Sequence, residues 1–206
     1  MKDKDFFIVG IGASAGGILP LFEFFANVPA NPGAAFVVVQ HLKRDYKSQM
    51  KNILSKYTDL PIFTITSGLA INPDCVYLMP ENTKVQIKDH HFYLEERKVN
   101  EIINYAIDKF FISLARDVKE KAVGIILSGM GSDGTKGAIA IEDAGGLIMV
   151  QDPESSEYEG MPDSAIHNDH PDYVLYPKEM GKHLLEYMKG KNKLGNISGT
   201  GEIDSP

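Results

Sequence analysis

The sequence is poor in cysteine, has no excess of positive charge and contains no long apolar run. Its 206 residues include one cysteine, Cys75, which excludes an internal disulfide and suits a reducing cytoplasm. The formal net charge is −7 and the lysines are scattered, so we do not expect nucleic acid as a partner. No stretch approaches the ~20 apolar residues that cross a bilayer, and the N-terminus lacks a signal-peptide cleavage pattern. We therefore expect a cytoplasmic protein without membrane insertion.

What the chain does contain is an alternation of apolar runs and helical patterns. Valine- and isoleucine-rich runs predict strands near residues 6–11, 35–40, 62–65, 122–127, 147–150 and 173–176. Apolar residues at three- and four-residue spacing predict helices over 17–26, 47–57, 100–118, 134–144 and 178–188. This alternation favours an α/β fold: a doubly wound, mostly parallel sheet with helices on both faces.

Two segments depart from the alternation. Between residues 74 and 95, three short apolar runs joined by turns, the first of them Val76-Tyr77-Leu78, predict a small antiparallel hairpin insertion. After Met188 the residues become small, polar and basic, which predicts a flexible tail or linker over 189–206. We therefore divide the chain into one folded domain, 1–188, and this tail.

A glycine-rich turn follows the first predicted strand. Gly12-x-Ser14-x-Gly16 has the spacing of a nucleophile elbow, in which a serine hydroxyl stands at the end of a strand. Backbone N–H groups beside it stabilise an oxyanion, so the same turn presents a nucleophile and assists it. Two other interpretations fit the same residues. Gly10-x-Gly12-x-x-Ala15 matches the dinucleotide-binding fingerprint, and a serine at this place also suits a plain helix cap.

The end of the second predicted strand helps to separate these interpretations. A dinucleotide site expects an acidic residue there to bind the ribose hydroxyls, but the apolar run 35–39 ends in Gln40-His41. A serine nucleophile needs a base, and the base usually needs an orienting carboxylate. The histidine therefore favours the serine hydrolase, with a structural histidine at a strand end as its alternative.

A second glycine-rich segment supplies a carboxylate. The predicted strand 122–127 runs into Ser128-Gly129-Met130-Gly131-Ser132-Asp133-Gly134, where Ser128 and Ser132 fit turn or cap roles. Ser14, His41 and Asp133 would then all follow the carboxyl ends of parallel strands. Because neighbouring strands are ~4.8 Å apart, we expect these side chains to converge if their strands are adjacent.

Taken together, these blocks resemble a known family. Gly-Ala-Ser-Ala-Gly-Gly, Val-Val-Gln-His, Gly-Met-Gly-Ser-Asp-Gly and Gly160-Met161-Pro162 are similar to the catalytic domain of chemotaxis protein-glutamate methylesterases, the CheB family, over about residues 6–187. The resemblance implies a methylesterase catalytic domain over 1–188 with a triad of Ser14, His41 and Asp133. More weakly, it implies an oxyanion and substrate pocket formed by Ala15, His41, Met130 and Gly131. We expect neither a cofactor nor a metal, since the histidine-containing stretch 167–170 matches no strong metal-ligand spacing.

The resemblance also implies a substrate and a reaction. The family removes methyl esters from glutamates on the cytoplasmic helices of chemoreceptors, and some members deamidate receptor glutamines. Methylated receptor helices are therefore the expected partner, and activity should rise with pH as His41 loses its proton. A catalytically weak docking or regulatory module of the same fold is the alternative.

The chain departs from the family pattern in three places. No receiver domain precedes the strand that begins at Phe6, Ala15 stands where many members carry threonine, and Arg97-Lys98-Val99-Asn100 lacks the proline expected before the long helix. The missing receiver and the linker-like tail resemble hybrid proteins in which this domain precedes a receptor methyltransferase domain. This raises the hypothesis that the chain is one domain of a longer polypeptide with a C-terminal methyltransferase domain.

Overall fold

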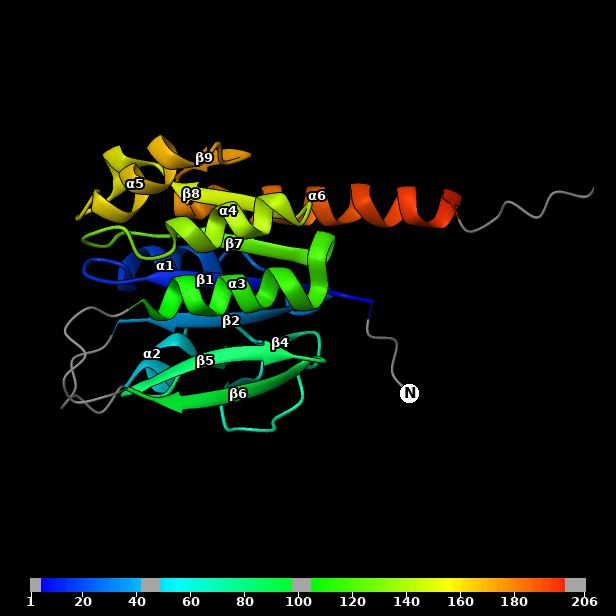
Figure 1. Ribbon diagram of the computed structural model, residues 1–206, viewed down its shortest axis with the longest axis horizontal. Coiled ribbons are helices and arrows are strands. Elements are labelled where there is room, and N and C mark those ends of the chain that lie inside the picture. Colours follow the sequence, from blue (N-terminus) through cyan, green and yellow to red (C-terminus); the bar gives the residue numbers. More distant parts are fainter. Residues whose placement is uncertain (1–4, 42–48, 98–104, 199–206) are drawn as a thin grey trace, which may run out of the picture.

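The computed structural model describes residues 5–41, 49–97 and 105–198, with side chains as far as Lys191. Within them, a seven-stranded sheet has the order β3-β4-β2-β1-β7-β8-β9, and every neighbouring pair is parallel (Figure 1). Its strands are β1 (Phe7–Ala13), β2 (Ala34–Gln40), β3 (Ile62–Thr64), β4 (Cys75–Leu78), β7 (Ala122–Ile126), β8 (Leu147–Gln151) and β9 (Tyr173–Leu175).

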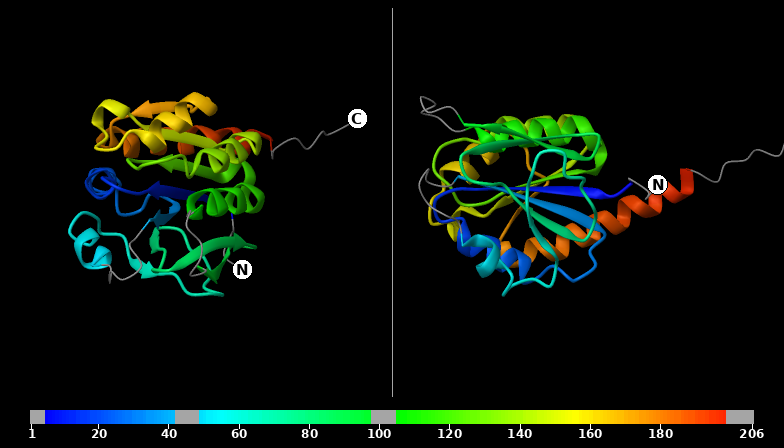
Figure 2. Two further views of the ribbon diagram at one scale, coloured as in Figure 1. Left: turned by 60° about the vertical axis from the view of Figure 1, so that its left-hand side comes forward. Right: turned by 90° about the horizontal axis from the view of Figure 1, so that it is seen from below.

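Helices cover both faces of this sheet (Figure 2). One face packs against α1 (Ile18–Phe25), α2 (Met50–Leu54) and α6 (Pro177–Ser198). The other packs against α3 (Ala106–Val118), α4 (Thr135–Asp143) and α5 (Gly160–Asn168), and short 3₁₀ turns occupy Lys119–Lys121 and Pro153–Ser155. The doubly wound, mostly parallel α/β fold predicted from the sequence is confirmed.

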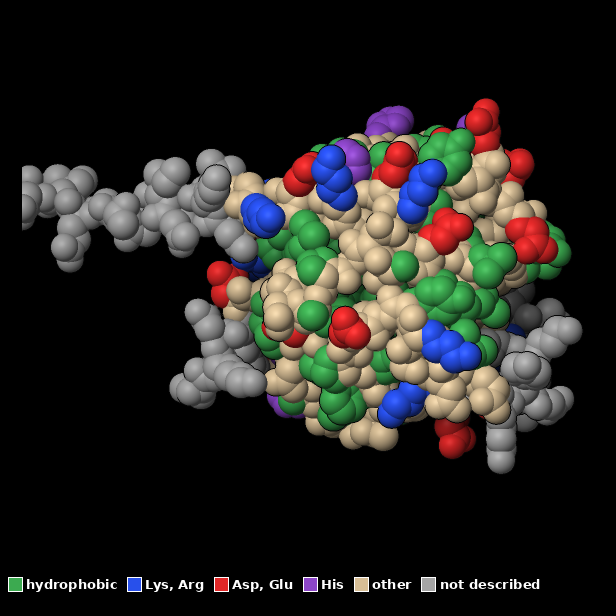
Figure 3. Space-filling view, turned by 180° about the vertical axis from the view of Figure 1, so that it is seen from behind, with side chains coloured by type: hydrophobic (Ala, Val, Ile, Leu, Met, Phe, Trp, Pro, Cys, Tyr) green, Lys and Arg blue, Asp and Glu red, His purple; other side chains and the backbone are tan. Residues whose placement is uncertain are grey.

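The strand β1 shows why both faces must be covered. Phe7, Val9 and Ile11 lie in the core on the α1 and α6 side, whereas Ile8 lies in the core on the α3 side. All seven residues of the strand are buried, as expected for the centre of a parallel sheet. Seen from behind, the surface carries small groups of hydrophobic side chains with charged side chains scattered between them (Figure 3).

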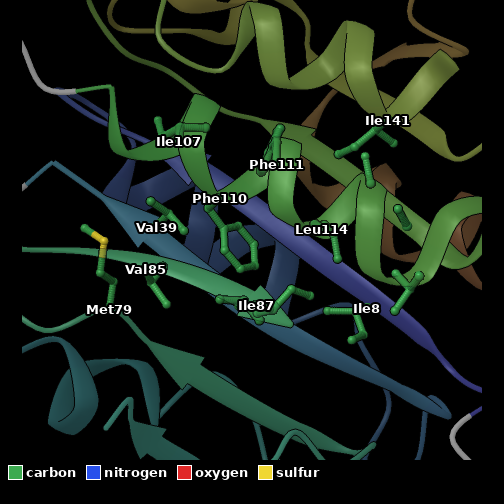
Figure 4. Packing of buried hydrophobic residues seen from close by; sticks show 14 of the residues in the cluster. Ile8, Val39, Met79, Val85, Ile87, Ile107, Phe110, Phe111, Leu114 and Ile141 are labelled. Atoms are coloured by element: carbon green, nitrogen blue, oxygen red, sulfur yellow. The ribbon is translucent and has the colours of Figure 1, made fainter. Parts of the chain in front are cut away.

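The helix α3 lies between the sheet and an antiparallel hairpin. The hairpin consists of β5 (Thr83–Lys88) and β6 (His91–Glu96), and it confirms the predicted insertion. Val85 and Ile87 of β5 share one buried cluster with Phe110 and Leu114 of α3, and Figure 4 shows the α3 side chains pointing toward Ile87. The insertion therefore covers a helix that would otherwise expose its apolar face.

Two glycines of β1 allow α3 to approach the sheet closely. A Cβ atom added at Gly10 would lie 2.8 Å from ring carbons of Phe110 and Phe111, and one added at Gly12 would lie 2.6 Å from Ile107. Real Cβ atoms essentially never come this close to a neighbour. These glycines, which also fit a dinucleotide fingerprint, thus serve helix packing and place the start of α3 near the end of β1.

Three details differ from the expectation. Val76-Tyr77-Leu78, predicted as part of the insertion, belongs to β4 of the main sheet, and all three residues are buried as in a strand covered on both faces. The helix α5 was not predicted, and α6 continues beyond Met188 through residues 189–198 of the predicted flexible tail. Some predictions lie outside the described residues: those for residues 199–206, for the segment 98–104 with Lys98-Val99-Asn100, and for the start of the helix predicted at 47–57.

Among the described residues, no helix combines the length and apolar character that a bilayer span requires.

Candidate active site

The candidate site lies where the strand order of the sheet reverses. β1 has β2 on one side and β7 on the other, and such a switch point opens a crevice at the carboxyl ends of the strands. Ser14 directly follows β1, His41 directly follows β2, and Asp133 lies on the loop after β7. The strand adjacency that convergence required is therefore confirmed.

Strand register places Ser14 beside His41. Ala13 of β1 pairs with Gln40 of β2, so the next residues on the two strands are Ser14 and His41. The His41 backbone N–H donates to the Ala13 carbonyl oxygen over 3.1 Å, which extends the parallel ladder by one step. Both side chains thus start from the same edge of the sheet, on strands ~4.8 Å apart.

The turn after Ser14 is made by glycine rather than by the serine. The Ser14 N–H donates to the Ser128 carbonyl oxygen (3.0 Å), and the positive φ, 71°, falls on Gly16. α1 begins with Gly17 as its N-cap and without a side-chain capping bond, so the plain helix-cap interpretation of Ser14 is wrong. The sharp reversal, at Gly16, comes two residues later than in a strict nucleophile elbow.

His41 and Asp133 form a close polar pair. The His41 Nε2 lies 2.7 Å from the Asp133 Oδ2, and the two side chains are 19% and 6% exposed. Because a carboxylate only accepts, Nε2 carries the proton of this hydrogen bond, and the lone pair of neutral His41 is on Nδ1. The imidazole therefore has one nitrogen fixed on Asp133 and the other available as a base.

Asp133 is held by the first turn of α3. Its Oδ2 accepts the Ile107 N–H and its Oδ1 accepts the Asp108 N–H, both over 2.9 Å. The N-terminal end of a helix has unsatisfied N–H groups and favours negative charge. The helix thus supplies what an ionised carboxylate needs in a buried place.

The predicted pocket residues border this crevice from two loops. The Ala15, Met130 and Gly131 N–H groups donate to no carbonyl oxygen of the described residues, and Met130 is 64% exposed. The His41 N–H is instead engaged with Ala13, so among the four predicted pocket residues Ala15, Met130 and Gly131 keep an N–H that binds no described carbonyl oxygen.

Ser128 joins three loops behind the nucleophile. Its buried hydroxyl donates to the Ala15 carbonyl oxygen (3.0 Å), also lies 3.3 Å from the Tyr158 carbonyl oxygen, and accepts the Tyr158 N–H (3.0 Å). Its own N–H donates to the side chain of Gln151 at the end of β8 (2.8 Å). The sequence favoured a turn or cap role for Ser128. It did not single out Gln151, although a glutamine at the end of a buried apolar run is a signal for a buried polar contact.

Asp108 is a second residue that the sequence did not single out. Its Oδ1 accepts the N–H groups of Gly134 and Gly137, each over 2.9 Å. Burial raises its pKa above the ordinary value, the Gly137 N–H opposes that rise, and the negative charge of Asp133 adds to it. Its place among the apolar positions 106, 107, 110 and 111 of the long helix was the only sequence signal.

Metal-ligand clusters and cavities of the described residues bear on what else the site could hold. Among them, no cluster of three or more His, Cys, Asp or Glu side chains is arranged to hold a metal ion. Cavities of about 500 and 560 Å³ lie along α3, the first lined by Ser113, Arg116 and the β5–β6 turn, and the second by residues of α3 and α4. Neither contains a residue of the crevice.

Comparisons with known proteins point to one family. The family model described as CheB methylesterase matches residues 9–184. A crystal structure of the Thermotoga maritima CheB methylesterase catalytic domain superposes with a TM-score of 0.80 at 30% identity, covering 89% of this chain and 99% of that one.

Curated sequences agree with that match. A protein-glutamate methylesterase/protein-glutamine glutaminase of Thermotoga maritima is 32% identical over 187 residues, which cover 87% of this chain and 53% of the relative. Its namesake from the group 3 operon of Pseudomonas putida is 36% identical over 159 residues, or 77% and 47%. An uncharacterised 104.1 kDa protein of Rhodobacter capsulatus is 33% identical over 155 residues, or 75% and 16%. The chain thus spans about half the length of the two named relatives and less of the third.

Proposed function

This chain belongs to the CheB methylesterase family, and from that premise we propose that it hydrolyses methyl esters of glutamate side chains on chemoreceptors. The observation that carries the proposal is the 2.7 Å contact between His41 Nε2 and Asp133 Oδ2, on a histidine whose neighbour in strand register is Ser14. The curated relatives are named glutaminases as well, which supports glutamine deamidation as a second activity of the same site.

The proposed reaction uses the His41–Asp133 pair and the hydroxyl of Ser14, the neighbour of His41 in strand register. The His41 Nδ1 takes the hydroxyl proton of Ser14 as the serine oxygen attacks the ester carbonyl carbon. Asp133 keeps the second proton on Nε2 and stabilises the imidazolium that forms. The imidazolium then returns its proton to the departing methoxide, so methanol leaves and an acyl-enzyme remains. Water attacks that ester by the same proton transfers, which frees Ser14 and leaves a glutamate carboxylate.

Backbone donors and apolar side chains suit the rest of the substrate. The Ala15, Met130 and Gly131 N–H groups are the candidates to bind the oxyanion, where each well-placed donor contributes about 3–4 kcal/mol. Two exposed apolar side chains follow the strand ends: Met130 lies on the loop after β7, and Leu19 lies at the start of α1. We propose that they contact the receptor helix around the ester. The alternative of a dinucleotide-binding domain is disfavoured because the β1 glycines pack against α3.

Methanol release from methylated receptor membranes tests the proposal directly. We expect Ser14→Ala to lower the rate by roughly 10⁴- to 10⁶-fold, because triad members act as a unit. Ser55→Ala is the matched control, since Ser55 is an exposed serine at the end of α2 and should leave the rate unchanged. A serine-directed phosphonate should label Ser14 in the native protein and fail to label it after His41→Ala.

Two results would contradict this assignment. Methanol release by Ser14→Ala at the native rate would exclude Ser14 as the nucleophile. A native protein that binds methylated receptor but releases no methanol would establish the docking-module alternative.

A further inference from the structure

The starts of α3 and α4 cap each other across the fold. Asp133, just before the N-cap Gly134 of α4, accepts two N–H groups from the first turn of α3. Asp108, in the first turn of α3, accepts two N–H groups from the start of α4, and all four bonds are 2.9 Å long. Neither helix has a capping bond from its own N-cap side chain, so each depends on the other's aspartate.

We propose that Asp108 is a positioning residue for the candidate triad: through the N–H groups of α4 it holds the backbone of Asp133 in the place where the Asp133 carboxylate meets His41. The inference rests on the proposed function. Asp133 lies between Asp108 and His41, so Asp108 acts through Asp133 and does not contact the substrate.

The hydrogen bonds form a closed ring that explains this role. The Asp108 N–H binds the Asp133 carboxylate, and the Asp108 carboxylate binds the N–H of Gly134, the residue after Asp133. Asp133 is therefore fixed at its side chain and at its following peptide by one residue of α3. Loss of the Asp108 side chain would free the second of these attachments, and the Oδ2 that faces His41 Nε2 would move with the loop.

Within the described part of the chain, the charged groups that act on Asp108 are Asp133 on the loop before α4 and Lys136 on α4, with opposite sign. The role proposed here depends on an acceptor oxygen at the Asp108 Oδ1 position rather than on its charge. Asparagine keeps such an oxygen, glutamate keeps the charge but carries its oxygens one methylene further, and alanine keeps neither. Activity should therefore follow acceptor geometry and not charge.

The experiment measures kcat and KM for methyl-ester hydrolysis with the native chain and Asp108→Asn, Asp108→Glu and Asp108→Ala. We expect kcat to fall roughly 10- to 100-fold in Asp108→Ala, the cost of a small misplacement, with KM nearly unchanged. Asp108→Asn should recover most of the loss and Asp108→Glu less of it. A higher kcat for Asp108→Glu than for Asp108→Asn would overturn the geometric role.

Asp117→Ala is the matched control on the same helix. Asp117 also accepts two backbone N–H groups, from Asp89 (2.5 Å) and His90 (3.0 Å), but at the far end of α3. It should lose stability without losing kcat. The two variants are compared at a temperature where both are folded. If Asp108→Ala and Asp117→Ala then lower kcat equally, Asp108 only caps a helix and the positioning role is refuted.

A readout without substrate separates this inference from the proposed function. The proton NMR signal of the His41 Nε2–H, which reports its hydrogen bond to Asp133, should move upfield in Asp108→Ala because the carboxylate is displaced. The signal should keep its position in Asp117→Ala and nearly keep it in Asp108→Asn. In Asp108→Glu it should move part of the way, and this variant serves as the test if Asp108→Ala fails to fold. An unchanged His41 Nε2–H signal in a folded Asp108→Ala or Asp108→Glu refutes the positioning role. A native chain that releases no methanol but shows these shifts refutes only the esterase activity.

Discussion

Replacing Ser128 by alanine removes the hydroxyl that joins the nucleophile turn to two other loops. The hydroxyl donates to the Ala15 carbonyl oxygen and accepts the Tyr158 N–H, and Ser128 itself is fully buried. The serine backbone is unaffected, so the Ser14 N–H keeps its acceptor, the Ser128 carbonyl oxygen. The substitution therefore loosens the turn from one side only.

The magnitude follows from these two hydrogen bonds. A stranded N–H costs about 1–3 kcal/mol and a lost neutral hydrogen bond about 1 kcal/mol. Because the Tyr158 side chain is exposed, water reaches this loop, and we take the lower end, about 2 kcal/mol of unfolding free energy. For a domain of this size that corresponds to a fall in Tm of about 4–8 °C. The Ala15 and Ser14 turn would also move, and we expect kcat to fall roughly 10- to 100-fold.

Ser113→Ala is a matched control for this prediction. Ser113 is 8% exposed, donates its hydroxyl to the Phe110 carbonyl oxygen (2.8 Å) and accepts the Ile87 N–H (3.0 Å), but it lies on α3 away from the crevice. Its stability loss, measured by urea unfolding, should equal or exceed that of Ser128→Ala, since the Ile87 N–H is buried. Its kcat for methanol release at 25 °C should be native. If the two variants lose kcat in parallel, the effect of Ser128 is on stability alone and our reasoning fails.

Two further predictions concern the start of α3. Gly12→Ala should lower both kcat and thermal stability, because the new Cβ would lie 2.6 Å from Ile107. The Ile107 N–H binds Asp133, so a shift of Ile107 would displace that carboxylate. A folded variant with native kcat would contradict this. The raised pKa of Asp108 means that the folded chain binds this proton more tightly than the unfolded chain does. Its stabilising contribution is therefore present below the ordinary pKa of 3.8 and is lost as pH rises through the raised value. In urea unfolding between about pH 3.5 and 6, the unfolding free energy of the native chain should fall relative to that of Asp108→Asn as pH rises. If the difference between the two unfolding free energies stays constant, the pKa of Asp108 is not raised by burial.

The central strands β1, β2, β7 and β8 were predictable because each is a continuous run of residues buried on both faces. β4 was misassigned because it is short and stands directly before two real hairpin strands, so its own local pattern is the same as theirs. Only its pairing with β2 and β3 distinguishes it, and pairing is a property of the folded chain. α5 was missed because its glycine and proline near the start are typical of a turn, whereas in the fold they begin a short helix that covers β8.

The candidate triad was predictable from strand ends, but the residues that hold it in place were not. Ser14, His41 and Asp133 each follow an apolar run, which is a local signal. Asp108 binds N–H groups of a helix 26 and 29 residues further along the chain, and Ser128 binds the turn 113 residues before it. Nothing local distinguishes such aspartates and serines from ordinary caps, because their partners meet them only after the sheet has formed.

The placement of the Asp133 carboxylate depends on a sequence of contacts that begins in β1. Gly12 has no side chain, so Ile107 packs directly on the strand, and the first turn of α3 comes to the carboxyl end of the sheet. Two N–H groups of that turn lie next to the loop that follows β7. Asp133 on this loop accepts both, and these hydrogen bonds offset the cost of removing its carboxylate from water. The same carboxylate then reaches Nε2 of a histidine that register has set beside Ser14. The base is thus oriented by one side chain, Asp133, whereas the side chains of Asp108 and Ser128 bind the backbone of the loops around it.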